Sequence, residues 1–327
     1  MSRDLAWATS AEIAQAVASG ASSALKIVDD CLARIEARNP ALNAFTAITA
    51  DRARAKARLI DAAPDKAKLP LAGVPFAVKN LFDIECLSTV AGSKINRTRP
   101  KAERDSPLIE RLEAAGAVLV GALNMGEYAY DFTGENVHDG PSRNPHDTGC
   151  MTGGSSGGPG GAVAGGMVPL AFGSDTNGSI RVPSSLCGVF GLKPTYGRLS
   201  RARSFPFVAS LDHLGPFART TRDLALSYDL MQGFDAEDAA CAERPVEPTM
   251  PELKRGLDGL RIAVAGGYFQ KGAFPEAIEA LARVAKAAGA RDEVEIPEAA
   301  RACAAAYVMC AQHGHRLGGG SPPASWS

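Results

Sequence analysis

The segment from residue 152 to 195 most constrains how this chain folds, because it places two glycine-rich turns around an apolar stretch. It reads TGGSSGGPGGAVAGGMVPLAFGSDTNGSIRVPSSLCGVFGLKPT. Glycines beside serines permit tight backbone conformations, although a flexible linker has a similar composition. The apolar residues that follow at once, from 162 to 172, exclude the linker, because a solvated linker does not carry such a stretch. The segment therefore predicts a buried, tightly turned part of a globular domain.

Two serines and one lysine supply the residue types of a serine hydrolase. Ser155 lies in GGSSGG, Ser179 lies 24 residues later in DTNGSIR, and Lys79 ends the apolar run of GVPFAVKN. A serine hydroxyl is a weak nucleophile that needs an adjacent base, and the five histidines stand in no recognisable motif. A lysine can serve as that base when burial keeps it neutral. The alternative is that Lys79 extends its ammonium into water from the end of a strand.

The three motifs together resemble the amidase signature family, whose members cleave carboxamides through an acyl-enzyme. The similarity runs from about residue 70 to 223 and continues more weakly over most of the chain. The resemblance implies that Ser179 is the nucleophile and Lys79 the base, with Ser155 relaying the proton from an unusual cis peptide. It implies an α/β fold with a single mixed sheet, flanked by helices on both faces, whose C-terminal part is missing here.

The turn that carries Ser179 is the predicted oxyanion hole. Its backbone N–H groups follow an apolar run and can converge on one point, where each donor is worth roughly 3–4 kcal/mol in a comparable hydrolase. The predicted donors are the N–H groups of Thr176, Asn177, Gly178 and Ser179. By the resemblance, Asp175 and Arg181 brace this loop; the alternative is an exposed ion pair of little energetic weight.

Three positions depart from the family pattern. Asn177 replaces the first of two glycines before the nucleophile, although asparagine tolerates a positive φ better than most residues. Asn80 replaces the usual acidic residue after the lysine, and Pro159 follows GGSSGG where a small residue is usual. A proline in the first turn of a helix loses no needed donor, so Pro159 is compatible with a helix that begins there.

Two other motifs are weaker. The run from Gly153 to Gly157 fits G-x-S-x-G, but that motif needs a buried strand directly before it, and the preceding SRNPHDTGCMT predicts a polar loop. Ser23 and Lys26 fit the S-x-x-K of penicillin-binding enzymes, but they lie in an amphipathic stretch without the partner motifs. We interpret the second match as part of a surface helix.

Composition places the chain among globular proteins. It has 327 residues, 46% hydrophobic content and a formal net charge of −1, which give no reason to expect nucleic acid or an anionic membrane as partner. The N-terminus has no signal-peptide pattern and no stretch is long enough to cross a membrane. Seven dispersed cysteines without a C-x-x-C pair indicate reduced thiols in a cytoplasmic protein. The predicted chemistry needs neither metal nor cofactor.

Hydrophobic periodicity predicts alternating helices and strands, as in an α/β sheet. Helices are expected over 10–38, ended by Asn39-Pro40, and over 51–61, 106–115, 157–166, 221–231 and 277–288. Strands are expected at 73–79, 118–122 and 260–265. In the basic clusters, Arg97 to Arg104 and Arg198 to Arg203, we expect solvated surfaces.

The end of the chain abandons this periodicity. A helix is expected to begin at 298, but CAQHGHRLGGGSPPASWS resembles a frameshifted or prematurely ended reading frame. We therefore divide the chain into an incomplete amidase domain, 1–310, and a tail, 311–327, without fixed structure. A natural disordered terminus is the alternative. In either case we expect the chain to be poorly stable or inactive.

The predicted function is hydrolysis of a small carboxamide with release of ammonia. The segments GEYAYDFTGENVHDGPSRNPHD and RLSRARSFPFVASLDHLGPF resemble the branch of the family that hydrolyses carboxybiuret. That resemblance implies a biuret-type substrate, and it leaves room for homodimerisation and for a small helical partner subunit. Two alternatives stay open: the amidase component of a glutamyl-tRNA amidotransferase, and an inactive remnant.

Overall fold

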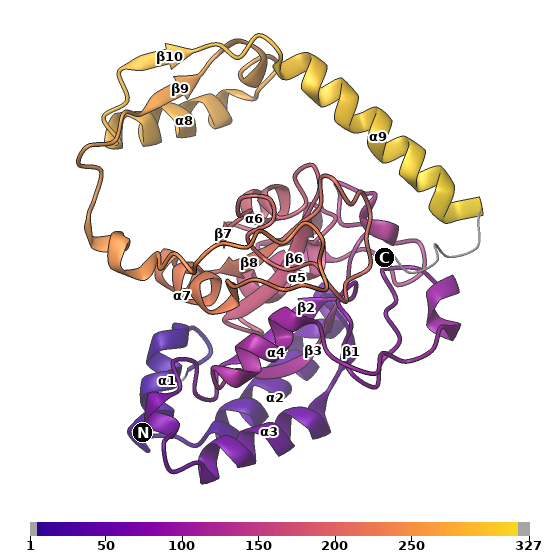
Figure 1. The fold of residues 1–327 in the computed structure, drawn as a ribbon, viewed down its shortest axis with the longest axis vertical. Helices are drawn as coiled ribbons and strands as arrows, with labels where there is room; N and C mark the ends of the chain where they lie inside the picture. The colour runs from indigo at the N-terminus through magenta and orange to yellow at the C-terminus, as the bar shows by residue number, and fades with distance from the viewer. Residues whose placement is uncertain (1–4, 320–327) are drawn as a thin grey trace. The chain divides into compact units, whose positions relative to one another are not determined.

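The computed structural model describes residues 5–319 and divides the chain into two compact units, Met1–Met250 and Pro251–Ser327 (Figure 1). The division falls about sixty residues earlier than the boundary expected at 310. In the first unit the helices are α1 (Ser10–Ala18), α2 (Ala24–Leu42), α3 (Ala50–Ala62), α4 (Pro107–Ala114), α5 (Gly157–Ala164), α6 (Arg181–Leu186) and α7 (Thr221–Met231). None of the helices in the described residues is both long and apolar enough to cross a membrane.

A six-stranded mixed sheet forms the centre of the first unit, as expected. Its strands in spatial order are β1 (Phe45–Ile48), β3 (Val118–Leu123), β2 (Pro75–Lys79), β6 (Leu170–Asp175), β8 (His213–Ala218) and β7 (Phe190–Gly191). Strand β2 runs parallel to both β3 and β6, whereas β1, β8 and β7 pair antiparallel with their neighbours. The parallel centre brings the carboxyl ends of β2, β3 and β6 to one edge of the sheet.

Helices lie on both faces of this sheet (Figure 1), and the strand residues differ between the faces. On one face small residues such as Ala171 and Gly173 leave room for the glycine-rich helix α5, which packs on β2, β3, β6 and β8. On the other face Phe76 and Phe172 meet edge to face, with ring centroids 5.7 Å apart. Helix α5 forms despite its low propensity, because close packing compensates for glycine's entropic cost.

Helices α4 and α7 confirm the periodicity from which they were predicted. Ile109 and Leu112 of α4 are fully buried, and α4 packs against α7 and β3. Helix α7 has the predicted bounds, and its N-cap Thr220 accepts a hydrogen bond from the Asp223 backbone N–H. These elements were predictable because an apolar face defines each of them locally, together with Pro107 in the first turn of α4 and the Thr220 cap of α7.

Two expectations for local structure were wrong. Helix α2 does not end at Asn39-Pro40 but continues through Pro40 to Leu42, and Asn43 closes it in the left-handed conformation. A proline in the last turn removes one helical hydrogen bond, which the Asn43 cap and the Asn39 side-chain bonds to Phe45 offset. The segment before Ser155 is not a loop but an exposed hairpin of β4 (Arg143–Asn144) and β5 (Asp147–Met151).

The second unit contains β9 (Ala263–Ala265) and β10 (Asp292–Val294), paired in parallel, with α8 (Pro275–Ala287) and α9 (Ala299–Gly319). Helix α8 has no buried residue, and every residue of β10 is exposed. Helix α9 continues to Gly319, so regular structure extends beyond the expected limit at 310, because residues 311–317 contain no helix breaker except one glycine. The rest of the expected tail, 320–327, lies outside the described residues.

Candidate active site

Lys79 is the centre of a buried polar cluster at the carboxyl ends of β2 and β6. Its side chain is fully buried, and its Nζ donates to Ser155 Oγ at 2.7 Å and to Ser174 Oγ at 2.9 Å. The alternative, an ammonium reaching water from the strand end, is therefore excluded. The carboxyl edge of parallel strands is where α/β sheets usually carry their sites.

Burial lowers the pKa of Lys79 from 10.5 to about 7. The negative charges of Asp131, Asp175 and Asp212 oppose this effect, but they do not cancel it. A buried ammonium loses its hydration, whereas the neutral amine loses much less. Near neutral pH a large fraction of Lys79 is therefore an unprotonated amine that can accept a proton.

Ser155 follows a cis peptide bond between Gly154 and Ser155, in keeping with the feature that the family resemblance implies. Its side chain is fully buried, and its carbonyl accepts a hydrogen bond from the Gly126 backbone N–H at 3.1 Å. The next residue, Ser156, donates its backbone N–H to the Ser179 carbonyl at 3.3 Å. This bond holds the two serine segments side by side, although 24 residues separate Ser155 from Ser179.

Ser179 lies just after β6 and is 4% exposed. Its hydroxyl makes no hydrogen bond within residues 5–319. Gly178 before it has φ +140°, a conformation that disfavours a side chain, whereas Asn177 does not adopt a positive φ. The replacement of the family's first glycine by Asn177 is thus compatible with the backbone.

Asp175 holds the turn together through hydrogen bonds to its backbone and to Arg181. Its buried carboxylate accepts the backbone N–H groups of Gly178 at 2.8 Å and Ile180 at 3.1 Å, together with two bonds from the Arg181 guanidinium. Burial by itself raises the pKa of Asp175, but the Arg181 bonds and backbone donors outweigh it and lower the pKa below 3.8. An exposed, weak ion pair is therefore not the correct description.

This bracing changes the predicted oxyanion hole. The Gly178 N–H is occupied by Asp175 Oδ1 and is not available to a bound substrate. The N–H groups of Thr176, Asn177 and Ser179 donate to no group in the described part of the chain. Three of the four predicted donors thus remain free, and the fourth fixes the loop.

Ser174 and Asp131 belong to the site but were not predicted. Ser174 is a polar residue at the end of an apolar strand, the same signal that singled out Lys79, but only the pairing of β2 with β6 brings them together. Asp131 accepts the backbone N–H groups of Thr133 and Gly134. No sequence motif identifies Asp131. Its carboxylate lies beside Gly154 only because the loop that contains it folds there.

Aromatic side chains from two loops pair with one another, and a third aromatic residue of the first loop reaches the turn that carries Ser179. Tyr128 contacts Phe205 and Tyr130 contacts Phe207, with ring centroids 5.6 Å apart in both pairs. Phe132 lies against the turn, because its ring edge is 3.5 Å from the position that a Cβ on Gly178 would occupy. The two segments that resemble the carboxybiuret branch therefore meet at the site.

The competing motifs have structural explanations. Ser23 caps helix α2 by accepting the Lys26 backbone N–H, and Lys26 Nζ pairs with Asp30, so the S-x-x-K match is part of a surface helix as predicted. Cys187 is fully buried, and burial raises its pKa to about 12. None of the seven cysteines forms a disulfide.

The first basic cluster is solvated as expected, and Arg104 pairs with Glu237 at the surface. For the second cluster the expectation was wrong, because Arg198 is buried and Arg201 pairs with the buried Asp238. His213 is half-buried and places Nδ1 near the Leu211 carbonyl, and burial lowers its pKa. It does not contact Ser155 or Ser179, so it is not their base.

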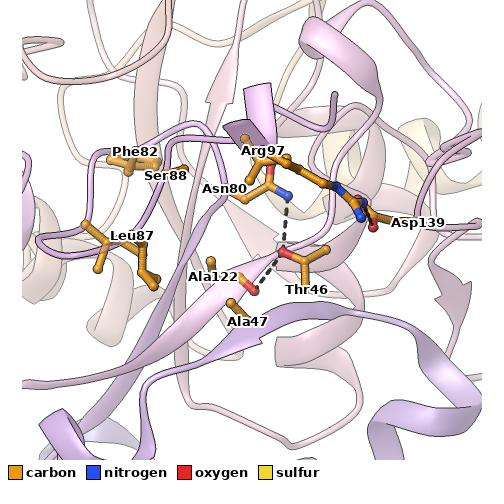
Figure 2. Close-up of a pocket in the computed structure, with 11 residues that line it drawn as sticks. Thr46, Ala47, Asn80, Phe82, Leu87, Ser88, Arg97, Ala122 and Asp139 are labelled. Carbon is orange, nitrogen blue, oxygen red and sulfur yellow. Dashed lines mark hydrogen bonds and ion pairs between the residues drawn. The ribbon is translucent and has the colours of Figure 1, made fainter. Parts of the chain in front are cut away.

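A separate cavity of about 290 Å³ opens on the β1 side of the sheet (Figure 2). Residues from β1, β3 and the loop after β2 line it, together with Asp139, but neither Lys79 nor the two serines do. Asn80 forms part of its wall and donates to Thr46 Oγ1 at 3.1 Å. Asn80 thus points away from the cluster around Lys79, although it is the next residue in the chain.

Comparison with known proteins gives consistent matches. The amidase family model matches residues 26–316. AtzE, a 1-carboxybiuret hydrolase subunit of Pseudomonas sp. (strain ADP), is 55% identical over 305 residues, which are 93% of this chain and 67% of that protein. A glutamyl-tRNA(Gln) amidotransferase subunit of Azotobacter vinelandii is 42% identical over 306 residues, covering 92% of this chain and 63% of that protein.

A solved structure gives the same result. It belongs to a vestigial protein complex that reveals the evolutionary origins of an s-triazine catabolic enzyme. It is 54% identical, with a TM-score of 0.92, over 94% of this chain and 68% of that one. The chain therefore spans about two thirds of the length of these relatives.

Proposed function

Because the chain belongs to the amidase family, we propose that it hydrolyses a small carboxamide through an acyl-enzyme on Ser179. The observation that carries this proposal is the buried Lys79, bonded to Ser155 and having a pKa lowered to about 7. A neutral amine at that position is the base that a serine nucleophile needs.

The proposed reaction has two halves. Ser179 Oγ attacks the amide carbon, its proton passes to Ser155 Oγ, and the Ser155 proton passes to Lys79 Nζ. The free N–H groups of Thr176, Asn177 and Ser179 stabilise the oxyanion. The relayed proton then returns to the amide nitrogen, the C–N bond breaks, and ammonia leaves. Water then attacks the carbonyl carbon of the remaining ester, and its proton passes through Ser155 to Lys79. The ester bond breaks, the proton returns to Ser179 Oγ, and the acid leaves.

We propose a biuret-type carboxamide as substrate. The 55% identity to a 1-carboxybiuret hydrolase subunit supports this assignment, as does the aromatic wall built by the two segments that resemble that branch. The second candidate is the amidase role in glutamyl-tRNA amidotransfer, which rests on 42% identity. Ammonia release from biuret favours the first candidate, and release from glutamine only in the presence of a partner chain favours the second.

A partner protein is part of the proposal. The solved relative is described as a protein complex. The second unit exposes several large apolar side chains, including Phe269, Phe274 and Val284, and such a surface supports association with a partner. The inactive-remnant alternative, a chain that persists only as an interaction subunit or not at all, also allows a partner, but it predicts no reactive serine.

Covalent labelling tests the proposed triad without requiring a complete substrate pocket. A sulfonyl fluoride should modify Ser179, because Ser179 Oγ attacks sulfur, fluoride leaves, and Lys79 receives the proton through Ser155. We expect one adduct, located on Ser179 by peptide mass spectrometry. Ser179→Ala should abolish it, and Lys79→Met should slow it by roughly 10²–10⁴-fold.

Ser185 is the matched control, because it is an exposed serine in α6, only six residues from Ser179. Ser185→Ala should retain the label. A label on another serine, or equal labelling of the Lys79→Met variant, would contradict the assigned roles. Thermal unfolding of each variant separates loss of reactivity from loss of fold.

A further inference from the structure

We propose that Asp212 is a positioning residue for the reaction at Ser179, because its carboxylate holds Thr176, one of the proposed oxyanion donors, together with the aromatic loop 205–208. This inference rests on the proposed function and adds to it a residue that no sequence motif identifies. Asp212 lies immediately before β8, and its two oxygens accept hydrogen bonds from both segments.

The pairing of β6 with β8 brings Asp212 beside the turn that carries Ser179. The two strands run antiparallel, and Asp175 of β6 lies opposite His213 of β8. Thr176 and Asp212 are the next residues beyond this pair, and Thr176 Oγ1 donates to Asp212 Oδ1. A hydrogen bond to a carboxylate is stronger than one between neutral groups, so the Thr176 side chain is held firmly at the end of the sheet.

The peptide bond between Asp175 and Thr176 is oriented by the same end of β8. The Asp175 carbonyl lies 3.2 Å from His213 Nδ1, which is the donor because a carbonyl only accepts. The C=O and N–H of a trans peptide point in opposite directions, so the Thr176 N–H points away from β8. Strand β6 has β2 on its other side, and Lys79 ends β2. The free N–H is therefore directed to the side of β6 on which the base lies.

The same carboxylate holds the aromatic loop. Asp212 Oδ2 accepts the backbone N–H groups of Phe207 at 2.8 Å and Val208 at 2.9 Å. Phe207 is 7% exposed, and its ring pairs with that of Tyr130. Because both oxygens of Asp212 are engaged with the protein, Asp212 acts through Thr176 and the loop.

The charge of Asp212 supplies a readout that a purely structural role would not change. Three carboxylates favour the ammonium form of Lys79 and oppose the effect of burial on its pKa: Asp131, Asp175 and Asp212. The groups that contact Lys79 Nζ are two serine hydroxyls, which carry no charge. Removing the Asp212 charge should lower the pKa of Lys79 further, because a nearby negative charge favours the ammonium. The pH midpoint of Ser179 labelling should then fall.

The rate of Ser179 sulfonylation, measured on the full chain from pH 5 to 10, tests this assignment. Asp212→Asn should lower the plateau rate by about 10- to 100-fold, somewhat less than complete loss of an oxyanion donor, and should move the midpoint to lower pH. Thr176→Val removes the hydroxyl but keeps the Asp212 charge, so it should slow labelling without lowering the midpoint. The double variant should be at most about threefold slower than Asp212→Asn, because both changes remove one shared interaction.

Asp229→Asn is the matched control. Asp229 of α7 accepts the backbone N–H groups of Thr249 and Met250 and the Thr249 hydroxyl, a set of donors like that of Asp212. It does not contact the turn that carries Ser179, so this variant should keep the rate and the midpoint of the parent.

Melting temperatures show whether the variants fold, and Thr176→Val decides the result if Asp212→Asn unfolds, since it leaves the bonds to the loop intact. Three outcomes would each overturn this proposal alone: a folded Asp212→Asn that matches Asp229→Asn in rate or in midpoint, a folded Thr176→Val that is labelled at the parent rate, or fully additive losses in the double variant. A parent chain that is not labelled on Ser179 would overturn the proposed function and this inference with it.

Discussion

Lys79 is an amine whose burial, not its neighbours, determines its protonation. Its pKa of about 7 predicts that the rate of Ser179 sulfonylation rises with pH and reaches half its plateau near pH 7, because only the unprotonated amine accepts the relayed proton. A solvated lysine would place this midpoint above pH 10. The measurement is the labelling rate from pH 5 to 10.

Lys79→Met is the control for this profile, since it keeps an unbranched side chain, one atom shorter than lysine, but removes the base. It should lower the rate at pH 8 by roughly 10²–10⁴-fold, the usual contribution of a general base. A midpoint near pH 7 that persists in Lys79→Met would assign the titration to another group, such as His213.

Two glycines of helix α5 should differ in how well they tolerate an added methyl group. A Cβ on Gly158 would lie 2.4–2.7 Å from backbone atoms of Asn124 and Ala44, whereas a Cβ on Gly161 would meet its nearest neighbour at 3.6 Å. Gly158→Ala should therefore destabilise the chain by several kcal/mol, because backbone must move. Gly161→Ala should be neutral or stabilising by up to about 1 kcal/mol, since alanine favours the helix. Urea unfolding of both variants checks this, and equal stabilities would show that α5 does not pack as closely as described.

The turn that carries Ser179 depends on one carboxylate. Asp175→Asn should cost about 2–3 kcal/mol at pH 7 through weakened charge-assisted bonds, less than for a fully buried pair because the Arg181 side chain is 55% exposed and regains water. It should also slow labelling of Ser179, since the turn loses its brace.

The stability lost in Asp175→Asn should depend on pH in a definite direction. The folded-state pKa of Asp175 lies below its ordinary 3.8, so its stabilisation is complete above that value and is lost as pH falls through the lowered pKa. The stability difference between parent and variant should therefore shrink below pH 4. A difference that stays constant from pH 7 to 3 would contradict it.

At the scale of the whole molecule, the two units should differ in local stability. The buried residues of the sheet lie in the first unit, whereas α8 has none and β10 is exposed throughout. Hydrogen exchange should therefore be slowest in β2 and β6 and fast in α8, because amides without buried packing open locally. Exchange read by mass spectrometry checks this, and protection of α8 equal to that of β2 would contradict it.

Features that depend on neighbours in the chain follow from the sequence alone. The apolar run before Lys79 predicts its burial, the glycines around Ser155 and Ser179 predict the turns, and single apolar faces predict α4 and α7.

Which groups meet depends on how the strands and loops pack in three dimensions. Ser174 reaches Lys79 because β2 and β6 pair in parallel, and the Gly178 N–H is taken by Asp175 because the turn folds back on the strand end. The cavity lined by Thr46 and Ala122 likewise needs β1 beside β3. Periodicity and turn propensity act over a few residues, whereas strand order and packing join segments tens of residues apart, so no local pattern encodes these contacts.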